Sequence, residues 1–554
     1  MRLHKKLIIT ALVILSLLAL AYVNRIHIFK YSLGWYTDIR FPRDLNKPVP
    51  WMAGPESADK PLMQRPPNII VILADDMGIN DVTLNGGGLA AQGVPTPHID
   101  SIARDGVRFD NGYAGAPVCT VSRAALMTGR YPWRFGVEFT PTPGAMARVA
   151  GTLYADSSKL HPLVVDREKA EKSKDFNDLG MPASEVTLAE VLKARGYHTL
   201  HIGKWHLGST PEMRPNNQGF DETLFMESGL HLPENSPKVV NSRQDFDPID
   251  KFLWPNMRFG VSYNGGKWFE PARYLADYYT DEAINAIKQN RNRPFFMYLA
   301  HWGVHTPLQA AREDYDALSA IPDHRMRVYA AMVRSIDRSV GRVLQTLKEQ
   351  GLDENTLVIF TSDNGAPGYI GLPDVNKPYR GWKLTMFEGG IKVPYVAKWP
   401  GHIKPGTHYQ AAMSNIDILP TAAAAAGATI PADRPMDGVN LLPFLGNDPA
   451  VQPGRALHWR DGPYRAMQEG KWKLIVAAKP DKKWLFNLAD DPTEKANLAQ
   501  SQPAKLAEMV GKMQAHHATM PEPLWPSFIE MAIEIDKPLN QKHLPTDEYV
   551  YWYN

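Results

Sequence analysis

The sequence predicts an α/β protein with a large mixed, mostly parallel sheet flanked by helices, and with a smaller C-terminal α+β subdomain. Three observations predict this class. Strand-like and helix-like segments alternate from residue 68 to residue 427, which is typical of a parallel sheet. Four of the strand-like segments run directly into polar residues, as expected at the carboxyl edge of such a sheet. Beyond residue 431 the strand-like pieces become short and a polar helix follows them.

The N-terminus predicts export. A basic start, MRLHKK, precedes an uninterrupted apolar run from Leu7 to Val23, which is typical of a signal peptide or of a short uncleaved membrane anchor. Ala19-Leu20-Ala21 offers a small-x-small cleavage site, so both alternatives stay open. The extreme N-terminal position and the basic flank disfavour a buried core helix.

Four segments follow from this reading. Residues 1–24 form the signal peptide or anchor, and residues 25–66 form a linker rich in Pro and aromatic side chains. Residues 67–430 form the main domain, and residues 431–554 form the C-terminal subdomain. We expect a periplasmic or cell-envelope protein, held in the inner membrane if residues 7–23 are retained.

The composition of the chain bears on its binding partners and on its cellular compartment. Lys and Arg total 61 against 59 for Asp and Glu, so no overall charge points to nucleic acid. The chain has one cysteine, Cys119, which cannot form an internal disulfide. It has no Asn-x-Ser/Thr acceptor site, which favours a bacterial envelope over a glycosylated secretory route.

The elements of the main domain are predicted from apolar runs and helical periodicity. The expected strands are residues 68–74, 197–203, 294–300, 356–362 and 393–399, and the clearest helices are 188–194 and 325–350. Residues 140–185 and 229–271 break this rhythm. Their Pro, Gly and exposed-type aromatics, such as Trp254 and Trp268, indicate loop insertions around a site.

Polar side chains gather where the predicted strands end. Asp75 and Asp76 follow the first strand, Lys204 and His206 the second, His305 the third, and Asp363 and Asn364 the fourth. Any one pair alone would be better explained by a loop cap or an Asx turn than by a site. Four strands that end this way indicate a shared site instead, because their carboxyl ends meet at one edge.

The oxygen-bearing members of this group predict a cation site. Asp75, Asp76, Asp363 and Asn364 supply three carboxylates and an amide, whose mutual repulsion a divalent cation would relieve. All-oxygen ligation suits Ca²⁺ or Mg²⁺ rather than zinc. We expect Ca²⁺, with Mg²⁺ as the less favoured ion.

Cys119 lies in GAPVCTVSRAALMTGR, residues 115–130. Residues 122–127 have helix-forming composition, and Thr128-Gly129 suits a helix end. Cys119 is therefore expected just before a helix N-terminus, where the dipole favours an anion and can activate a thiol.

At this point the chain resembles a known family. Cys119-Thr-Val-Ser-Arg123, followed by Leu126-x-Thr128-Gly129-Arg130, is similar to the signature of type I, arylsulfatase-like sulfatases of the alkaline phosphatase superfamily. Further segments resemble the family's other motifs in the family's order: ADDMG (74–78), GKWHLG (203–208), VHTP (304–307), SDNG (362–365), KLTMFEGG (383–390) and WLFNLADDPTEKANLA (484–499).

The resemblance implies a sulfuric ester hydrolase. A formylglycine-generating enzyme would oxidise Cys119 to formylglycine, whose hydrate attacks sulfur with one hydroxyl and expels sulfate by deprotonation of the other. The metal would contact Asp75, Asp76, Asp363, Asn364 and the modified residue 119. Arg123, Lys204 and Lys383 would stabilise charge, His305 with Lys383 would protonate the leaving alcohol, His206 would assist elimination, and Asp363 could deprotonate the attacking hydroxyl.

Two departures from the family pattern and two alternatives accompany this interpretation. In VHTP the first residue is Val304, where Pro is common, while His305 and Pro307 are kept. The third position of the cysteine motif is usually Pro or Ala and is Val121 here, although a β-branched residue also favours an extended segment. A phosphodiester or phosphonate monoester hydrolase would share the fold and nucleophile. A non-catalytic sulfoglycan-binding protein would keep an unconverted Cys119. The substrate stays open between sulfoglycan, aryl sulfate and alkyl sulfate; the aromatics of residues 229–271 favour a sugar or aryl group.

Overall fold

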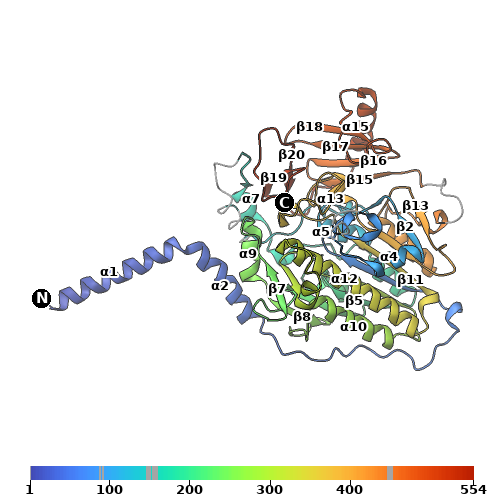
Figure 1. Ribbon diagram of the computed structural model, residues 1–554, viewed down its shortest axis with the longest axis horizontal. Helices are drawn as coiled ribbons and strands as arrows, with labels where there is room; N and C mark the ends of the chain where they lie inside the picture. The colour runs from blue at the N-terminus through green and yellow to red at the C-terminus, as the bar shows by residue number, and fades with distance from the viewer. Residues whose placement is uncertain are drawn as a thin grey trace.

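The computed structural model describes residues 2–554 except 87–88, 90–92, 145–146, 148–150, 152–159 and 446–452. A nine-stranded sheet lies at its centre, with helices on both faces (Figure 1). In spatial order the strands are β13 (Thr407–Tyr409), β2 (Val107–Phe109), β12 (Tyr395–Lys398), β11 (Thr356–Ser362), β1 (Asn68–Ala74), β9 (Phe295–Ala300), β5 (His198–Gly203), β6 (Glu222–Gly229) and β8 (Phe259–Tyr263).

The pairing confirms the predicted fold class. Neighbours from β11 through β1, β9 and β5 to β6 are parallel. The sheet is mixed because β12 pairs antiparallel with both β11 and β2, and β8 pairs antiparallel with β6. All five strands expected from the sequence are present, with boundaries within two residues of the prediction.

Alternation along β1 explains how the sheet carries a core on each face. Ile69, Val71 and Leu73 point into one apolar cluster, and Ile70 and Ile72 point into the other. The helices of the first face are α5 (Cys119–Thr128), α8 (Leu188–Ala194) and α14 (Ile418–Ala426). Those of the second face are α4 (Pro97–Arg104), α10 (Leu275–Gln289) and α12 (His324–Glu349).

The region predicted as a loop insertion over 229–271 is more ordered than expected. It contains β7 (Val239–Ser242), β8 and α9 (Pro248–Asn256). Asp247 caps α9 by accepting hydrogen bonds from the amides of Ile249 and Asp250, a signal that the sequence analysis missed. Trp254 is buried rather than exposed, and its indole donates to Asp250.

The other insertion, 140–185, lies partly outside the described residues. Its described part holds β4 (Val164–Val165), which pairs with β19 (Ile529–Glu534), and the short helix α7 (Arg167–Lys172). β19 pairs in turn with the C-terminal strand β20 (Tyr549–Tyr553).

The C-terminal subdomain has the α+β composition that the sequence predicts. Its antiparallel sheet comprises β15 (Ala456–Asp461), β16 (Tyr464–Glu469), β17 (Trp472–Ala477) and β18 (Lys482–Asn487), and α15 (Pro503–His517) packs on it. A buried Lys473 joins this sheet to the main domain through Glu388. The proposed division between 67–430 and 431–554 is therefore crossed by charged contacts.

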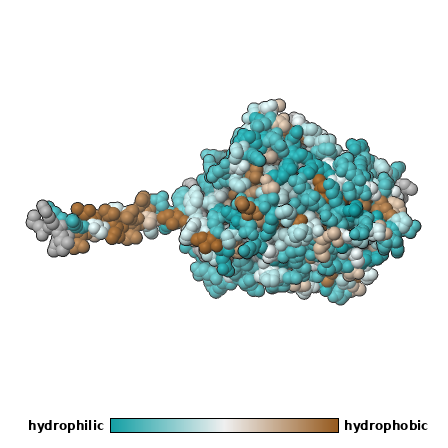
Figure 2. Space-filling view, turned by 90° about the horizontal axis from the view of Figure 1, so that it is seen from below, coloured by the Kyte–Doolittle hydropathy of each residue, from teal (hydrophilic) through white to brown (hydrophobic). Residues whose placement is uncertain are grey.

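The N-terminal segment differs from the predicted linker. α1 (Arg2–Val23) projects from the body with its apolar side chains exposed, and Figure 2 shows apolar side chains along the projecting segment. α2 (Arg25–Arg40) then packs against α9, as Figure 1 shows. Helical structure therefore extends well into the residues predicted as a linker, 25–66. The periodicity was hidden because α2 has apolar residues on two faces.

Candidate active site

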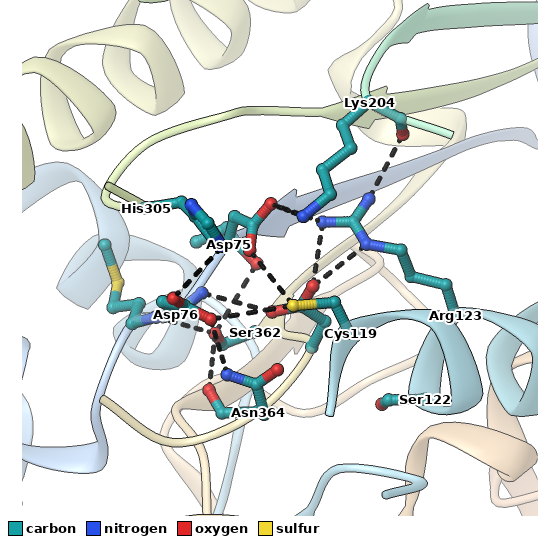
Figure 3. A network of polar contacts seen from close by, with 12 residues as sticks. Asp75, Asp76, Cys119, Ser122, Arg123, Lys204, His305, Ser362 and Asn364 are labelled. Carbon is teal, nitrogen blue, oxygen red and sulfur yellow. Dashed lines mark hydrogen bonds and ion pairs between the residues drawn. The ribbon is translucent and has the colours of Figure 1, made fainter. Parts of the chain in front are cut away.

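The carboxyl ends of β1, β5, β9 and β11 lie at the same edge of the sheet, because their last residues pair with one another. Ala74 of β1 pairs with Ser362 of β11, while Leu73 of β1 and Gly203 of β5 both pair with Ala300 of β9. The residues that follow these strands therefore leave the sheet side by side. This places the four expected polar groups around one point, as Figure 3 shows for most of them.

Asp75 and Asp76 form the centre of the site. Both side chains are fully buried. Asp76 adopts a left-handed backbone conformation with φ of 63°, and its amide donates to Asp363 Oδ1 at 3.1 Å. This turn directs two successive carboxylates into the same space, which an extended strand would place on opposite faces.

Cys119 lies against these carboxylates. Its Sγ is 3.6 Å from Asp75 Oδ1 and 3.7 Å from Asp76 Oδ1. The thiol belongs to the first turn of α5, after an extended Val118, so the prediction that it precedes the helix was one turn off. Gly129 ends α5 in the left-handed conformation, as the sequence predicts.

Arg123 lies one turn further along α5 and has no solvent exposure. Its guanidinium donates to Asp363 Oδ2 at 2.9 Å and to Asp75 Oδ2 at 3.1 Å. It also donates to the carbonyl oxygen of Lys204 at 3.1 Å. Arg123 therefore ties three of the four strand ends together. Ser122, on the other side of the helix, accepts from Gly115 and stays outside the cluster.

Two lysines complete the charge pattern. Lys204 Nζ lies 2.5 Å from Asp75 Oδ2. Lys383 Nζ lies 2.6 Å from Asp76 Oδ1 and 3.1 Å from Cys119 Sγ. We call the following residues the charged cluster: Asp75, Asp76, Cys119, Arg123, Lys204, Asp363 and Lys383. Its three carboxylates are balanced by three cations, so a bound divalent ion would make it positive and attractive to an anionic ester.

The residues present fit such an ion. Asn364 Nδ2 donates to Asp76 Oδ1 at 2.7 Å, while Asn364 Oδ1 is buried with no hydrogen-bond partner. An orphaned buried oxygen beside two carboxylates is the donor that a hard cation requires. Possible ligand atoms of Asp75, Asp76, Cys119 and His305 all lie within 4.8 Å of one another. His305 thereby joins the ligand candidates that the sequence analysis named.

Two histidines approach from the pocket side. His305 Nδ1 lies 2.6 Å from the carbonyl oxygen of Thr306, so it carries the hydrogen and leaves Nε2 facing Asp76 Oδ2 at 3.6 Å. His206 has φ of 64°, which turns its ring toward the pocket, and its Nδ1 is buried without a partner. Both imidazoles have a ring nitrogen available for a ligand.

The pKa values of the acidic groups in the charged cluster are shifted in different directions. Burial, reinforced by Asp363, raises the pKa of Asp75 to about 7. Burial also acts on Asp76, but Lys383 and His305 outweigh it and hold the pKa of Asp76 below its usual range. Burial raises the pKa of the Cys119 thiol far above its usual range. The sequence-based idea of a thiol activated by the helix dipole is therefore wrong for the unmodified residue.

A pocket of about 510 Å³ opens above the charged cluster. Cys119, Lys204, His206, His305 and Lys383 lie at its floor. Most of the remaining lining is apolar, and we call its main side chains the apolar wall: Phe225, Ile249, Phe252, Leu253, Met257 and Trp302. Among the described residues of the lining, the acidic ones outside the floor are Glu227 and Asp247, and every cationic one lies at the floor.

Three contacts were missed by the sequence analysis. Tyr369 donates to Asp76 Oδ2 at 3.0 Å, and Tyr298 lies 3.5 Å from Arg123. Trp302 stacks on His305 and lies 4.7 Å below the Lys204 ammonium. No sequence signal marks either tyrosine: Tyr298 lies inside the apolar run of β9, and Tyr369 lies in a short turn between Pro367 and Gly371 that has no periodic pattern. Trp302 follows a strand, like the predicted residues, and could have been found on that basis.

Comparison with known families agrees with this geometry. Residues 67–428 match the family described as sulfatase, and residues 380–520 match N-sulphoglucosamine sulphohydrolase, C-terminal. The chain is 36% identical over 391 residues to N-acetylgalactosamine-6-sulfatase of Homo sapiens, covering 69% of this chain and 66% of that protein. It is 34% identical over 400 residues to Homo sapiens arylsulfatase A, covering 69% and 68%.

A solved structure shows the same architecture. The crystal structure of Ps i-CgsB in complex with k-i-k-neocarrahexaose aligns with a TM-score of 0.68 and 30% identity, over 83% of this chain and 95% of that one. The match with N-acetylgalactosamine-6-sulfatase spans slightly less than two thirds of that relative's length. Because the family match covers most of the chain and includes every strand end of the charged cluster, the chain belongs to the sulfatase family of the alkaline phosphatase superfamily.

Proposed function

We propose that this protein hydrolyses sulfate monoesters, using formylglycine formed from Cys119 and one Ca²⁺. The observation that carries the proposal is the position of Cys119 Sγ, 3.1 Å from Lys383 Nζ and within 3.7 Å of both Asp75 and Asp76. A nucleophile attached there would lie between the carboxylates that hold a cation and the ammonium groups that face an anion.

The cation and the modified residue have defined places in this chain. Asp75, Asp76, Asp363 and Asn364 would hold the cation, together with the oxygen of residue 119, and His305 lies within reach. When present, the cation supplies positive charge at the ester oxygens, and formylglycine supplies a hydroxyl nucleophile through its hydrate. Mg²⁺ is the less favoured ion, because it requires near-ideal octahedral geometry and loses its water reluctantly, whereas Ca²⁺ accepts a flexible set of carboxylate and amide oxygens.

Charge stabilisation falls to three fixed cations. Arg123 is held by Asp75 and Asp363 and cannot move without breaking both contacts. Lys204 lies on Asp75, with Trp302 beneath it, and Lys383 lies on Asp76. Preorganised charges of this kind act on the transferring group without a reorganisation cost.

Proton transfer falls to the histidines. His305 can exchange a proton only at Nε2, because Nδ1 is held by the Thr306 carbonyl, and Nε2 faces the place where the leaving oxygen would depart. Lys383 contacts the other carboxylate oxygen of Asp76, Oδ1, at 2.6 Å and would support this step as a second donor beside residue 119. His206 also lines the pocket, and its unpartnered Nδ1 would hydrogen-bond the hydrate of residue 119.

Maturation of Cys119 must precede folding in this proposal. Cys119 is 4% exposed and lies in the first turn of α5, so a formylglycine-generating enzyme cannot read it as an extended segment in the folded chain. Val121 is fully buried and packs in the core, so the helix tolerates it there, and its branched side chain favours the extended segment that precedes folding.

Mass spectrometry tests the nucleophile directly. In protein made by its native host, the tryptic peptide from Phe109 to Arg123 should carry an aldehyde at position 119. The aldehyde is lighter than the thiol because oxygen replaces sulfur and two hydrogens are lost. An intact thiol would contradict the catalytic proposal and favour the alternative, a sulfoglycan-binding protein that never forms the aldehyde.

A paired assay separates the second enzyme class. The chain could act on phosphate diesters or phosphonate monoesters through the same nucleophile, and the phosphonate monoester hydrolase of Agrobacterium radiobacter shares the fold with a TM-score of 0.56. One cation and three fixed basic residues suit a monoanionic ester, whether its central atom is sulfur or phosphorus. We expect faster turnover of an aryl sulfate than of an aryl phosphate diester, and the reverse order would overturn the sulfatase assignment.

Export completes the proposal. α1 contains a 19-residue segment, Lys5–Val23, that is long and apolar enough to cross a membrane. We propose that it directs the chain to the bacterial envelope, as a cleaved signal or as a retained anchor in the inner membrane. N-terminal sequencing of the envelope-localised protein distinguishes the two, because cleavage after Ala21 would leave α2 as the first element.

A further inference from the structure

α2 carries apolar side chains on two faces, and only one of them is used inside the protein. Phe29, Leu33 and the small Gly34 face α9. Ile28, Tyr31, Trp35 and Ile39 form a second stripe at helical spacing, and each is between 52% and 67% exposed. Four large apolar side chains in a row on a solvent-facing stripe need a partner.

The docked face of α2 is held against α9 and the residues that follow α9. A side chain at Gly34 would meet the carbonyl oxygen of Pro255 at 2.3 Å, so the two helices touch at backbone distance. Asp38 accepts from Arg258 Nε at 2.7 Å and from its NH2 group at 2.9 Å. Phe41 stacks on Trp268 directly after the helix, with ring centroids 4.8 Å apart.

The same α9 residues serve both α2 and the active-site pocket. Phe252 and Leu253 of α9, and Met257 directly after it, pack with Phe29 and Leu33 of α2 and also line the pocket. α9 therefore lies between α2 and the pocket, and it supplies much of the apolar wall. A partner that binds the exposed stripe of α2 would therefore be separated from the active-site pocket only by α2 and α9.

The exposed stripe of α2 lies next to the candidate membrane span, which indicates a lipid surface as its partner. Asn24 alone separates α2 from the candidate membrane span in α1. Arg25 lies over the Tyr22 ring at 4.3 Å at this junction, and the stripe itself contains Tyr31 and Trp35. Aromatic side chains with adjacent basic residues are typical of a helix at the membrane–water boundary.

We propose that the Ile28–Tyr31–Trp35–Ile39 stripe of α2 lies in the surface of a lipid bilayer and holds the active-site pocket beside it. This inference rests on the proposed sulfatase function for its second part: the substrate is a monosulfated amphiphile drawn from the lipid phase. The lining supports that class, because every cation among its described residues lies at the floor. The rest of the described lining is mostly apolar, and its acidic members are Glu227 and Asp247. Among the described lining residues, a polysulfated glycan would find no cation beyond those at the floor.

A depth measurement tests the surface without any turnover. In the full chain reconstituted into vesicles of phosphatidylethanolamine and phosphatidylglycerol, an environment-sensitive dye is attached at W35C. The matched control is K471C, in the exposed turn between β16 and β17, and the unsubstituted chain measures labelling of Cys119. We expect blue-shifted emission and quenching by spin-labelled lipid at position 35 alone. Equal, water-like emission at both positions would overturn the proposal.

A kinetic experiment tests the consequence. The variant I28E/W35E/I39E should lose roughly tenfold in rate on a long-chain alkyl sulfate embedded in vesicles, because the pocket is no longer held at the lipid surface. Its rate on a soluble aryl sulfate should be unchanged. The control M63E/L524E/L544E adds the same charge at exposed apolar positions elsewhere and should affect neither substrate.

The outcomes are separable. Equal losses on both substrates, or no loss on either, would overturn the membrane proposal while leaving the sulfatase proposal intact. Turnover of neither substrate by the unsubstituted protein would count against the proposed function, and the dye at position 35 would then decide the surface by itself.

Discussion

The charged cluster and the apolar wall face each other across one pocket and are built in opposite ways. The cluster is assembled from strand ends that are far apart in sequence, and each member is held by contacts to other members, such as Arg123 to Asp75 and Asp363. The wall comes largely from α9 and its neighbourhood, held by apolar packing on α2. The side chains of the charged cluster are thus held in fixed positions, as catalysis requires. The apolar wall is suited to binding the leaving group of the substrate, and its contacts are less strictly defined.

The largest effect should follow removal of the cluster's central cation. Arg123→Met leaves Asp75 and Asp363 buried without their shared partner, and we expect kcat/KM on an aryl sulfate to fall at least about 10³-fold. Arg134→Met is the control, since Arg134 pairs with Asp437 away from the pocket and its loss should leave the rate nearly unchanged. A variant at position 123 within about tenfold of the parent would show that the cluster is not a catalytic unit.

A second prediction concerns the support behind the cluster. Lys473 is fully buried between Glu388 and Glu494, at 2.7 and 2.8 Å, and so joins the C-terminal sheet to the segment that follows Lys383. Lys473→Met should lower the free energy of unfolding by about 3–5 kcal/mol, measured by urea titration, because two carboxylates lose their counter-charge. Lys471→Met, at an exposed neighbouring position, should change it little. Equal effects would mean that the two domains are joined by packing rather than by this charge.

Cation binding gives a third test of the cluster that does not depend on activity. After treatment with a chelator, added Ca²⁺ should raise the Tm, since an ion at a hundred times its Kd stabilises the native state by about 2.7 kcal/mol. Asn364→Leu removes the buried unpartnered oxygen and should reduce this rise. Mg²⁺ at the same concentration should give a smaller rise. The cation assignment would be wrong if Ca²⁺ left the Tm of the unsubstituted protein unchanged.

The wall should respond in binding rather than in chemistry. Phe252→Ala should raise KM roughly tenfold for a sulfate ester with a long apolar leaving group and leave kcat unchanged, because about 1–3 kcal/mol of apolar contact is lost. Phe252 also packs toward α2, so Met226→Ala, which lines the pocket from β6, is the matched variant. A fall in kcat with constant KM in both variants would erase the distinction between wall and cluster.

The smallest effect is expected at the ion pair between α2 and the body. Asp38→Asn weakens the contact with Arg258, which is partly exposed and so contributes less than about 1 kcal/mol to global stability. The change should instead appear locally, as faster proteolysis near α2 with an unchanged global Tm. A large fall in Tm would show that α2 is part of the folding core and not an attached element.

Much of the fold and of the cluster was predictable, for identifiable reasons. β1 and β11 are continuous apolar runs with sharp polar ends, so both their boundaries and the acids that follow them are visible in the sequence. The same reasoning found Lys204, His206 and His305. It failed for β2, β6, β8 and β13, which are short or carry polar residues because they lie toward the sheet margins, and for Trp254, whose burial depends on Asp250.

The sequence by itself determined the sheet, the order of the polar groups along the chain and the family, because apolar periodicity and local motifs are properties of consecutive residues. Only the tertiary structure decided that Tyr369 contacts Asp76, that the unmodified Cys119 thiol is not activated, and that α9 separates the pocket from α2. These depend on burial and on contacts between distant segments, whose energies no stretch of consecutive residues contains.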